Sequence, residues 1–155
     1  MNNQINTTVT YRQGSAADDY TTFLIFEETL ADLVSRLGFG GETSWGDEAE
    51  QVKMWQQRRP LYAHLSQTAE QFWVAEQHGQ TVGFARSILR GGVRELTELF
   101  VKPGTQSAGL GRGLIERAFP KEGATNRLII ATSDFRAQAL YLKSGVFPRF
   151  PIYFF

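Results

Sequence analysis

QSAGLGRG, residues 106–113, follows a strand-like run from Glu95 to Lys102 and opens a helix-like run from Leu110 to Phe119. Three glycines between a strand and a helix leave a loop with little side-chain bulk. Its backbone N–H groups can turn toward one point at the positive end of the helix dipole, and such a point binds phosphate. The alternative is a turn in which the glycines serve conformation alone, and the octapeptide by itself leaves both interpretations open.

Two nucleotide-binding loops do not fit this stretch. A P-loop requires G-x-x-x-x-G-K-[ST], but after Gly109 the sequence has Leu110 and Gly111 where Lys and Ser or Thr belong. The dinucleotide fingerprint G-x-G-x-x-G also fails, because Glu116 stands where the third glycine would follow Gly111 and Gly113. Any phosphate site here must therefore follow another pattern.

Two motifs, in order, resemble the GNAT superfamily of N-acetyltransferases. The first is V-K-P-x-x-Q-x-x-G-x-G, residues 101–111, which resembles the acyl-CoA pyrophosphate loop of that superfamily. The second is D-x-x-A-x-x-x-Y-x-x-x-G, residues 134–145, which is similar to the family's N-x-x-A-x-x-x-Y-x-x-x-G helix. It follows RLIIAT, residues 127–132, which predicts a buried strand. The resemblance extends from about residue 71 to residue 155, and to the N-terminal part only by architecture.

The resemblance implies how acetyl-CoA, the acyl donor, is bound. In this family the strand before the glycine loop and the strand before the tyrosine helix splay apart, and the pantetheine arm lies in the opening. An amide-rich ligand there would form hydrogen bonds with the backbone N–H and C=O groups that the splayed strands leave unpaired. The cofactor-binding residues that this implies are Leu99, Phe100, Val101, Gln106, Ser107, Ala108, Gly109, Leu110, Gly111, Arg112, Asp134 and Ala137.

One of these positions departs from the family pattern. Asp134 stands where the family often has Asn, and an ionised carboxylate accepts hydrogen bonds but cannot donate them. The alternative for Asp134 is that it only caps the helix.

The resemblance also implies catalytic roles. Tyr141 stands where the family places the phenol that stabilises or protonates the leaving thiolate, although a tyrosine here can also simply pack its ring on the sheet. The attacking amine needs a base, for which Glu95 and Glu98 are candidates. Glu95 matches the position where some members carry the base, and Glu98 lies nearer the expected carbonyl. A chain of waters is the alternative to both.

Strand alternation bears on the choice between the two glutamates. It places Glu95 with Thr97 on one face and Glu98 with Leu96 on the other, so that only one can face the cleft unless a bulge intervenes.

Length and composition predict a single soluble domain over residues 1–155. A chain of 155 residues with 42% hydrophobic content buries roughly 70% of its unfolded surface. Sixteen basic and sixteen acidic side chains cancel, so no global field draws the chain to nucleic acid or anionic lipid. The absence of cysteine excludes disulfides and thiolate chemistry, and two distant histidines, His64 and His78, predict no metal site. With a polar N-terminus and no long apolar run, we expect a cytoplasmic protein.

The expected fold is α/β, an α+β mixed sheet of GNAT type. Its order is strand, helix, helix, three-stranded meander, helix, strand, helix, strand, with the C-terminal strands incomplete. The expected segments are a strand at 7–12, a helix after the Ser15–Asp18 capping box that ends at Gly38, a helix from Asp47 to Arg59 that Pro60 kinks or restarts, and strands at 72–75, 82–89 and 93–101. Acceptor specificity is expected from the helical part, where Phe39, Glu42, Trp45 and Trp55 lie.

The C-terminal run VFPRFPIYFF, residues 146–155, predicts one last strand, where the family normally carries a further pair. So apolar an edge invites pairing with another chain. We therefore expect a truncated domain, the first half of a tandem protein, or a homodimer that shares strands.

Two functional hypotheses follow. The first is an N-acetyltransferase that passes the acetyl group of acetyl-CoA to a primary amine. The second is a non-catalytic CoA-binding or regulatory module of a larger assembly.

Overall fold

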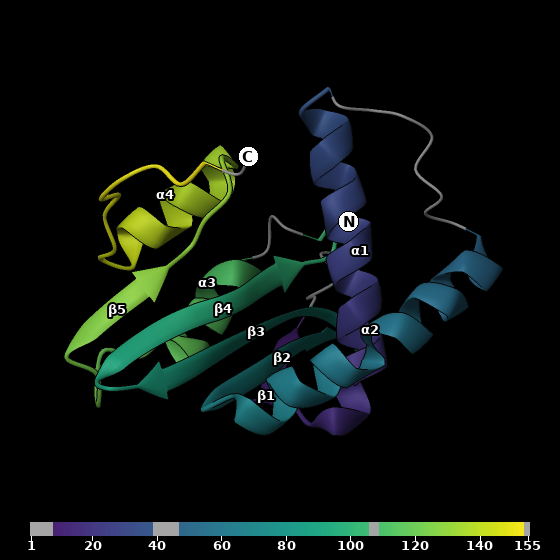
Figure 1. The fold of residues 1–155 in the computed structure, drawn as a ribbon, viewed down its shortest axis with the longest axis horizontal. Helices are drawn as coiled ribbons and strands as arrows, with labels where there is room; N and C mark the ends of the chain where they lie inside the picture. The colour runs from purple at the N-terminus through teal and green to yellow at the C-terminus, as the bar shows by residue number, and fades with distance from the viewer. Residues whose placement is uncertain (1–7, 39–46, 106–108, 154–155) are drawn as a thin grey trace, which may run out of the picture.

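The computed structural model describes residues 8–38, 47–105 and 109–153 (Figure 1). The order of elements predicted from the sequence is confirmed through the last helix. The elements are β1 (Val9–Gln13), a 3-10 turn (Ala16–Asp18), α1 (Asp19–Arg36), α2 (Glu48–Thr68), β2 (Gln71–Gln77), β3 (Gln80–Arg90), β4 (Val93–Val101), α3 (Leu110–Ala118), β5 (Asn126–Ile129) and α4 (Phe135–Lys143).

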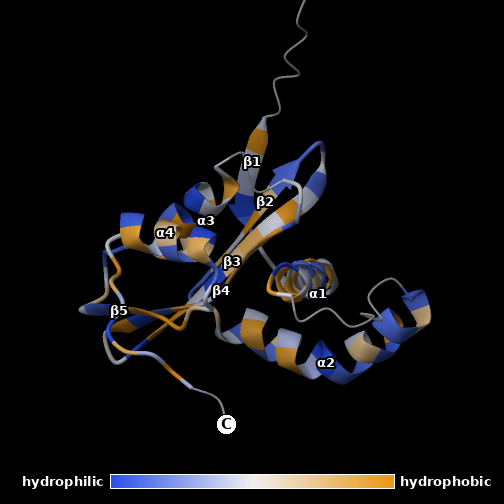
Figure 2. Cartoon of the chain, turned by 90° about the horizontal axis from the view of Figure 1, so that it is seen from above, coloured by the Kyte–Doolittle hydropathy of each residue, from blue (hydrophilic) through white to orange (hydrophobic). Residues whose placement is uncertain are grey.

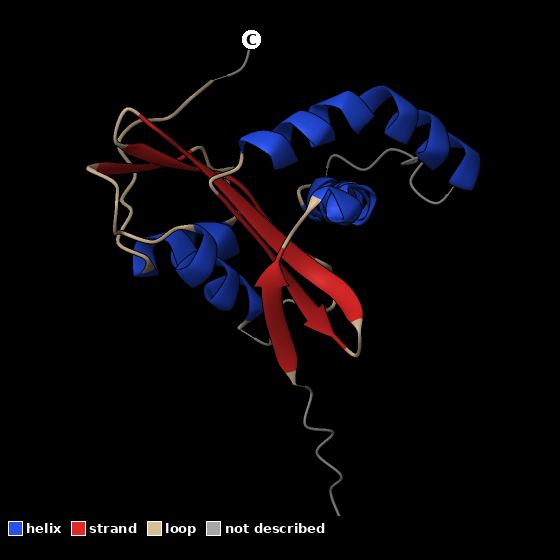
Figure 3. Cartoon of the chain, turned by 90° about the horizontal axis from the view of Figure 1, so that it is seen from below, coloured by secondary structure: helices blue, strands red, loops and turns tan. Residues whose placement is uncertain are grey.

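The strands form one mixed sheet in the order β1-β2-β3-β4-β5. Neighbours from β1 to β4 are antiparallel, and β5 runs parallel to β4. The helices α1 and α2 cover one face, and α3 and α4 cover the other (Figure 2, Figure 3). None of the described helices is long and apolar enough to cross a membrane.

Local signals set where the first two helices begin. Ser15 and Asp18 form the predicted capping box, with the Ser15 N–H donating to the Asp18 carboxylate at 2.8 Å. Asp47 caps α2 by accepting from the Ala49 N–H at 2.9 Å. The helix does not restart at Pro60 but continues to Thr68. Proline removes one backbone hydrogen bond, and the packing of buried Tyr62 against the ring of Phe23 on α1 compensates for that loss.

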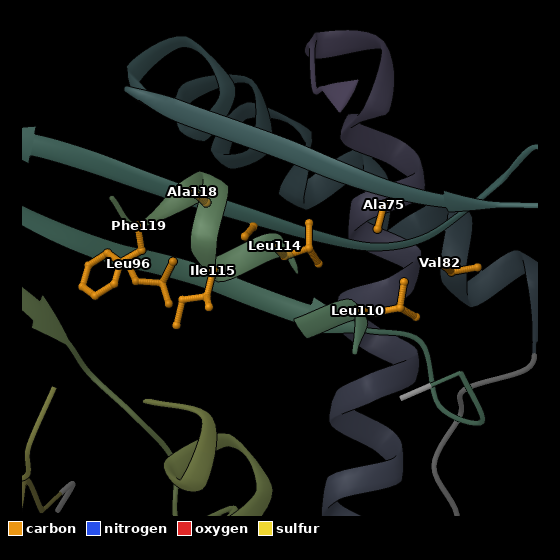
Figure 4. Close-up of a cluster of buried hydrophobic side chains, with 9 residues drawn as sticks. Ala75, Val82, Leu96, Leu110, Leu114, Ile115, Ala118 and Phe119 are labelled. Atoms are coloured by element: carbon orange, nitrogen blue, oxygen red, sulfur yellow. The ribbon is translucent and has the colours of Figure 1, made fainter. Parts of the chain in front are cut away.

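The main core lies between the sheet and α3 (Figure 4). Leu110, Leu114 and Ala118 recur four residues apart, so they form one stripe along the helix. This stripe packs on side chains of the central strands, among them Ala75, Val82, Ala85 and Leu96. Burying this stripe anchors α3 on the sheet.

A β-bulge in β4 changes which side chains share a face. Arg86 on β3 is opposite Glu98 and Ser87 is opposite Leu96, so that Thr97 is an extra residue. Leu96 and Leu99 consequently both pack on the α3 side. This bulge is the exception under which both glutamates can share a face. Glu95 and Glu98 each neighbour one of these leucines, and both point to the other face.

The strand after α3 is shorter and more exposed than predicted. The expectation was a buried strand over residues 127–132, but β5 ends at Ile129, and Leu128 and Ile130 are 43% and 58% exposed. The reason is its place at the edge of the sheet, where one neighbouring strand is missing within the described residues.

The predicted last strand is also wrong for residues 146–153, which form none in the described part of the chain; residues 154–155 lie outside it. Pro148 and Pro151 explain this. They are an odd number of residues apart, so each edge of a strand here would lack a donor.

Candidate active site

A cavity of about 490 Å³ opens where β4 and β5 separate. The parallel ladder between them ends at the pair Leu96 and Ile129. Beyond this pair, the cavity is bounded by α1, the second half of β4, the end of β5 and α4. Lining residues that the sequence had singled out are Glu98, Leu99, Phe100, Val101, Gly111, Asp134, Ala137 and Tyr141. Tertiary structure thus brings the two motifs to a single opening.

The N-terminus of α3 lies at this cavity. Gly109 is the N-cap residue with φ of 73°, a left-handed conformation that favours glycine, and it makes no side-chain cap hydrogen bond. Gly111 lines the cavity so close to α4 that a Cβ there would lie 3.1 Å from Leu140. The helix therefore presents backbone N–H groups and the positive end of its dipole with little bulk in the way.

Other predicted loop residues serve differently. The side chain of Leu110 is buried in the core, so only its backbone can reach a ligand. Arg112 is exposed and pairs with Glu116 at 2.9 Å. Gln106, Ser107 and Ala108 lie outside the described residues.

Tyr141 lies on α4 and lines the cavity. Burial, together with the negative charge of Asp134, raises the pKa of the Tyr141 phenol to about 12. The phenol therefore keeps its proton across the neutral range and is available as a proton donor.

Asp134 caps α4 and also lines the cavity. Its carboxylate accepts from the Arg136 N–H at 2.8 Å and from the Arg36 guanidinium of α1 at 2.9 Å. Burial favours the protonated acid, but these hydrogen bonds and the charge of Arg36 outweigh it and lower the Asp134 pKa. An ionised Asp134 thus ties α4 to α1 across the cavity.

The two glutamates of β4 differ in environment. The Glu98 side chain is 11% exposed and accepts from Arg86 Nη1 through Oε2 at 2.7 Å. Burial raises the Glu98 pKa, Asp19 adds to the rise, and the charge and hydrogen bond of Arg86 oppose it. Glu95 shares this face of the strand but is not among the described residues that line the cavity. Of the two candidates, Glu98 is thus the one that the cavity contains.

Sequence reasoning missed the residues that surround Glu98, namely Arg86 and Asp19. A signal was available, because Arg86 interrupts an otherwise apolar strand between Phe84 and Ile88, and a charge in such a run is rarely unpaired. Its partner Asp19 lies far away in sequence and could not have been identified.

The aromatic acceptor candidates give a mixed result. Trp55 packs against Tyr20, Phe23 and Tyr62, which places it in an aromatic cluster between α1 and α2. Phe39, Glu42 and Trp45 lie outside the described residues.

A family model described as an acetyltransferase (GNAT) domain matches residues 68–145. No curated protein matches the chain.

Three solved structures illustrate the likeness of fold. The PaiA N-acetyltransferase from Thermoplasma acidophilum, in complex with coenzyme A, has a TM-score of 0.66 at 17% identity over 88% of each chain. An aminoglycoside acetyltransferase from an uncultured soil metagenomic sample has a TM-score of 0.64 at 18% identity, over 96% of this chain and 97% of that chain. AAC(6')-Iy in complex with the bisubstrate analogue CoA-S-monomethyl-acetylneamine has a TM-score of 0.58 at 15% identity, again over 96% and 97%.

Proposed function

Because this chain belongs to the GNAT acetyltransferase family, we propose that it transfers the acetyl group of acetyl-CoA to a primary amine, which attacks the thioester directly. One observation carries the proposal. The cavity between β4 and β5 holds a partly buried phenol, Tyr141, and a partly buried carboxylate, Glu98, beside the N-terminus of α3. These are an acid, a base and an anion site in one opening.

Acetyl-CoA would occupy the gap between the strands. Its pantetheine arm would run along Leu99, Phe100 and Val101, and its pyrophosphate would meet the N–H groups that begin α3 at Gly109. Support comes from the coenzyme A complex of the PaiA enzyme and from the bisubstrate complex of AAC(6')-Iy, both of which share this fold.

In the proposed reaction, the amine nitrogen forms a bond to the thioester carbonyl carbon. The resulting tetrahedral intermediate collapses, and the C–S bond breaks with its electron pair passing to sulfur. Tyr141 gives its proton to the leaving thiolate, and Glu98 takes the proton that the amine nitrogen loses, directly or through a water molecule. The raised pKa of each group suits its role, because Tyr141 stays protonated and Glu98 becomes a stronger base.

Substitution of Glu98 with glutamine is expected to lower kcat by about 100-fold or more, the usual contribution of a positioned base. The matched control is Glu95→Gln, on the same strand and face but outside the cavity lining, which we expect to stay within about threefold of wild type. Initial rates of thiol release from acetyl-CoA measure both. Equal losses in the two variants, or none in either, would contradict a role for Glu98 as base.

The proposal is tested first by calorimetric titration of the purified protein with acetyl-CoA, followed by a panel of primary amines. Micromolar or tighter binding is expected, because the cavity and the N-terminus of α3 act together. An amine that then releases free CoA identifies the acceptor class. A folded sample that binds no acetyl-CoA would overturn the proposal.

The C-terminal part supports a proposal about assembly. Several large apolar side chains on and just after β5, at the start of α4 and after α4 are exposed, among them Leu128, Ile130, Phe135, Phe147 and Phe150. An edge strand beside such a surface pairs readily with another chain. We infer a homodimer, with a second GNAT-like domain as the alternative partner. Sizing of the titrated sample should give the mass of two 17.5 kDa chains, and a monomer at all concentrations would overturn this.

A further inference from the structure

Arg86 on β3 is 0% exposed, although it is charged. Its guanidinium lies over the Phe72 ring, 3.9 Å from the ring centroid. Through Nη1 it donates to Glu98 Oε2 at 2.7 Å, and through Nη2 to Asp19 Oδ1 at 3.1 Å. The arginine thus connects α1 to the cavity wall formed by β4.

The Asp19 side of this cluster is held in place by neutral donors and acceptors. Arg86 Nη2 also donates to the hydroxyls of Thr22 and Ser66, at 3.2 and 3.1 Å. The Ser66 hydroxyl in turn donates to Asp19 Oδ1. Residues of two helices, α1 and α2, therefore hold Nη2 of the guanidinium, while Nη1 contacts Glu98.

The hydrogen bond from Arg86 occupies only one of the two Glu98 carboxylate oxygens. Arg86 engages Oε2 alone, and within the described part of the chain Oε1 makes no hydrogen bond. Glu98 lines the cavity, whereas Arg86 and Asp19 are buried behind it. The arginine is thus placed to hold the carboxylate by one oxygen while the other meets the acceptor amine.

We infer that Arg86 is a positioning residue for the acetyl transfer proposed above, held by Asp19 and Phe72 so that it fixes the Glu98 carboxylate at the cavity wall. This inference rests on the proposed function. It assigns a role to two buried charges, Arg86 and Asp19, that contact neither acetyl group nor amine.

Removal of the Asp19 charge and removal of the Arg86 charge should move the Glu98 pKa in opposite directions. Asp19→Asn removes a like charge and frees Arg86 for Glu98, which lowers the Glu98 pKa. Arg86→Met removes the opposing positive charge and raises it. The titratable or charged groups that act on Glu98 are Arg86 from β3, Asp19 from α1 and Tyr62 from α2. Those that line the same cavity are Arg36, Asp134, Arg136 and Tyr141.

The experiment is a pH titration of the Glu98 side-chain carboxyl by carbon-13 NMR, with the signal assigned by its loss in Glu98→Gln. We expect a midpoint about one pH unit lower in Asp19→Asn and about one unit higher in Arg86→Met. Arg86→Lys, which keeps the charge, should fall between wild type and Arg86→Met. The acid limb of the pH–rate profile should follow the same directions.

Arg94→Met is the matched control. Arg94 is equally buried and is paired with Glu70 at 2.8 Å, but it lies on the α3 side of the sheet. Its loss should lower the unfolding temperature without moving the Glu98 midpoint.

Shifts of the same sign in Asp19→Asn and Arg86→Met, or a shift in Arg94→Met of equal size, would overturn the inference. If Arg86→Met does not fold, a midpoint in Asp19→Asn that fails to fall overturns it instead. Midpoints that move as expected in a protein that acetylates no amine would refute the proposed function and leave the hold of Arg86 on Glu98 intact.

Discussion

Replacement of Gly109 with leucine is expected to weaken acetyl-CoA binding by about 100-fold or more, because the pyrophosphate loses charge-assisted hydrogen bonds from backbone N–H groups. At φ of 73° a leucine side chain is strained, and its bulk projects where the N-terminus of α3 must approach the phosphates. The strain itself costs only about 1–2 kcal/mol, a fraction of the stability of an ordinary domain, so the protein should remain folded. Calorimetric titration with acetyl-CoA measures the loss.

Gly79→Leu is the matched control for this variant. Gly79 has φ of 75° in the turn between β2 and β3 and, like Gly109, has open space where a Cβ would stand. It should destabilise the fold by a similar amount and leave binding unchanged. If Gly109→Leu still binds acetyl-CoA, the pyrophosphate does not bind at this loop. If both variants lose acetyl-CoA binding to the same extent, backbone strain alone explains the loss.

Tyr141→Phe is expected to lower kcat by about 100-fold to 10,000-fold, with acetyl-CoA affinity within a few-fold of wild type. Phenylalanine keeps the partly buried ring but removes the proton that the leaving thiolate takes. Because the Tyr141 pKa is raised to about 12, the wild-type rate should not fall on the basic side from loss of this proton until the pH approaches that value. Rates and affinities measured between pH 6 and roughly pH 10 would check both statements.

Tyr20→Phe provides the control, since Tyr20 packs on Trp55 in the aromatic cluster between α1 and α2 and not on the cavity. Its rate should equal that of wild type. The comparison also separates the two functional hypotheses, because a CoA-binding module has no transfer rate to lose. Wild-type turnover in Tyr141→Phe would assign the proton to another donor.

Much of the fold follows from short-range patterns. The capping box at Ser15, the start of a helix at Asp47 and the antiparallel meander were predicted from neighbouring residues and are confirmed. The glycine motif and the tyrosine motif also gave the family, because both need particular residues at fixed spacing. Contacts between residues that are close in sequence depend on the local residue pattern, so the sequence alone predicts them.

Elsewhere, long-range packing prevailed over the local pattern. Pro60 stands inside a continuous helix because Tyr62 packs on α1, and the strand predicted over residues 127–132 is short and half exposed because it forms the edge of the sheet. Neither outcome can be predicted from the residues of the segment itself, because each depends on which other elements lie beside it.

The sequence by itself determined the family, the order of elements through the last helix and the residues of the two family motifs, since these depend on residue type and spacing along the chain. Tertiary structure alone decided which glutamate lines the cavity. Thr97 has no register partner on β3, and this bulge is what brings Glu98 to the same face as Glu95. The bulge exists only because β4 pairs with β3, so it depends on pairing between strands. The contact of Glu98 with Arg86 and Asp19 likewise joins segments that are distant in sequence, because burial of a charge requires partners that only the assembled fold brings together.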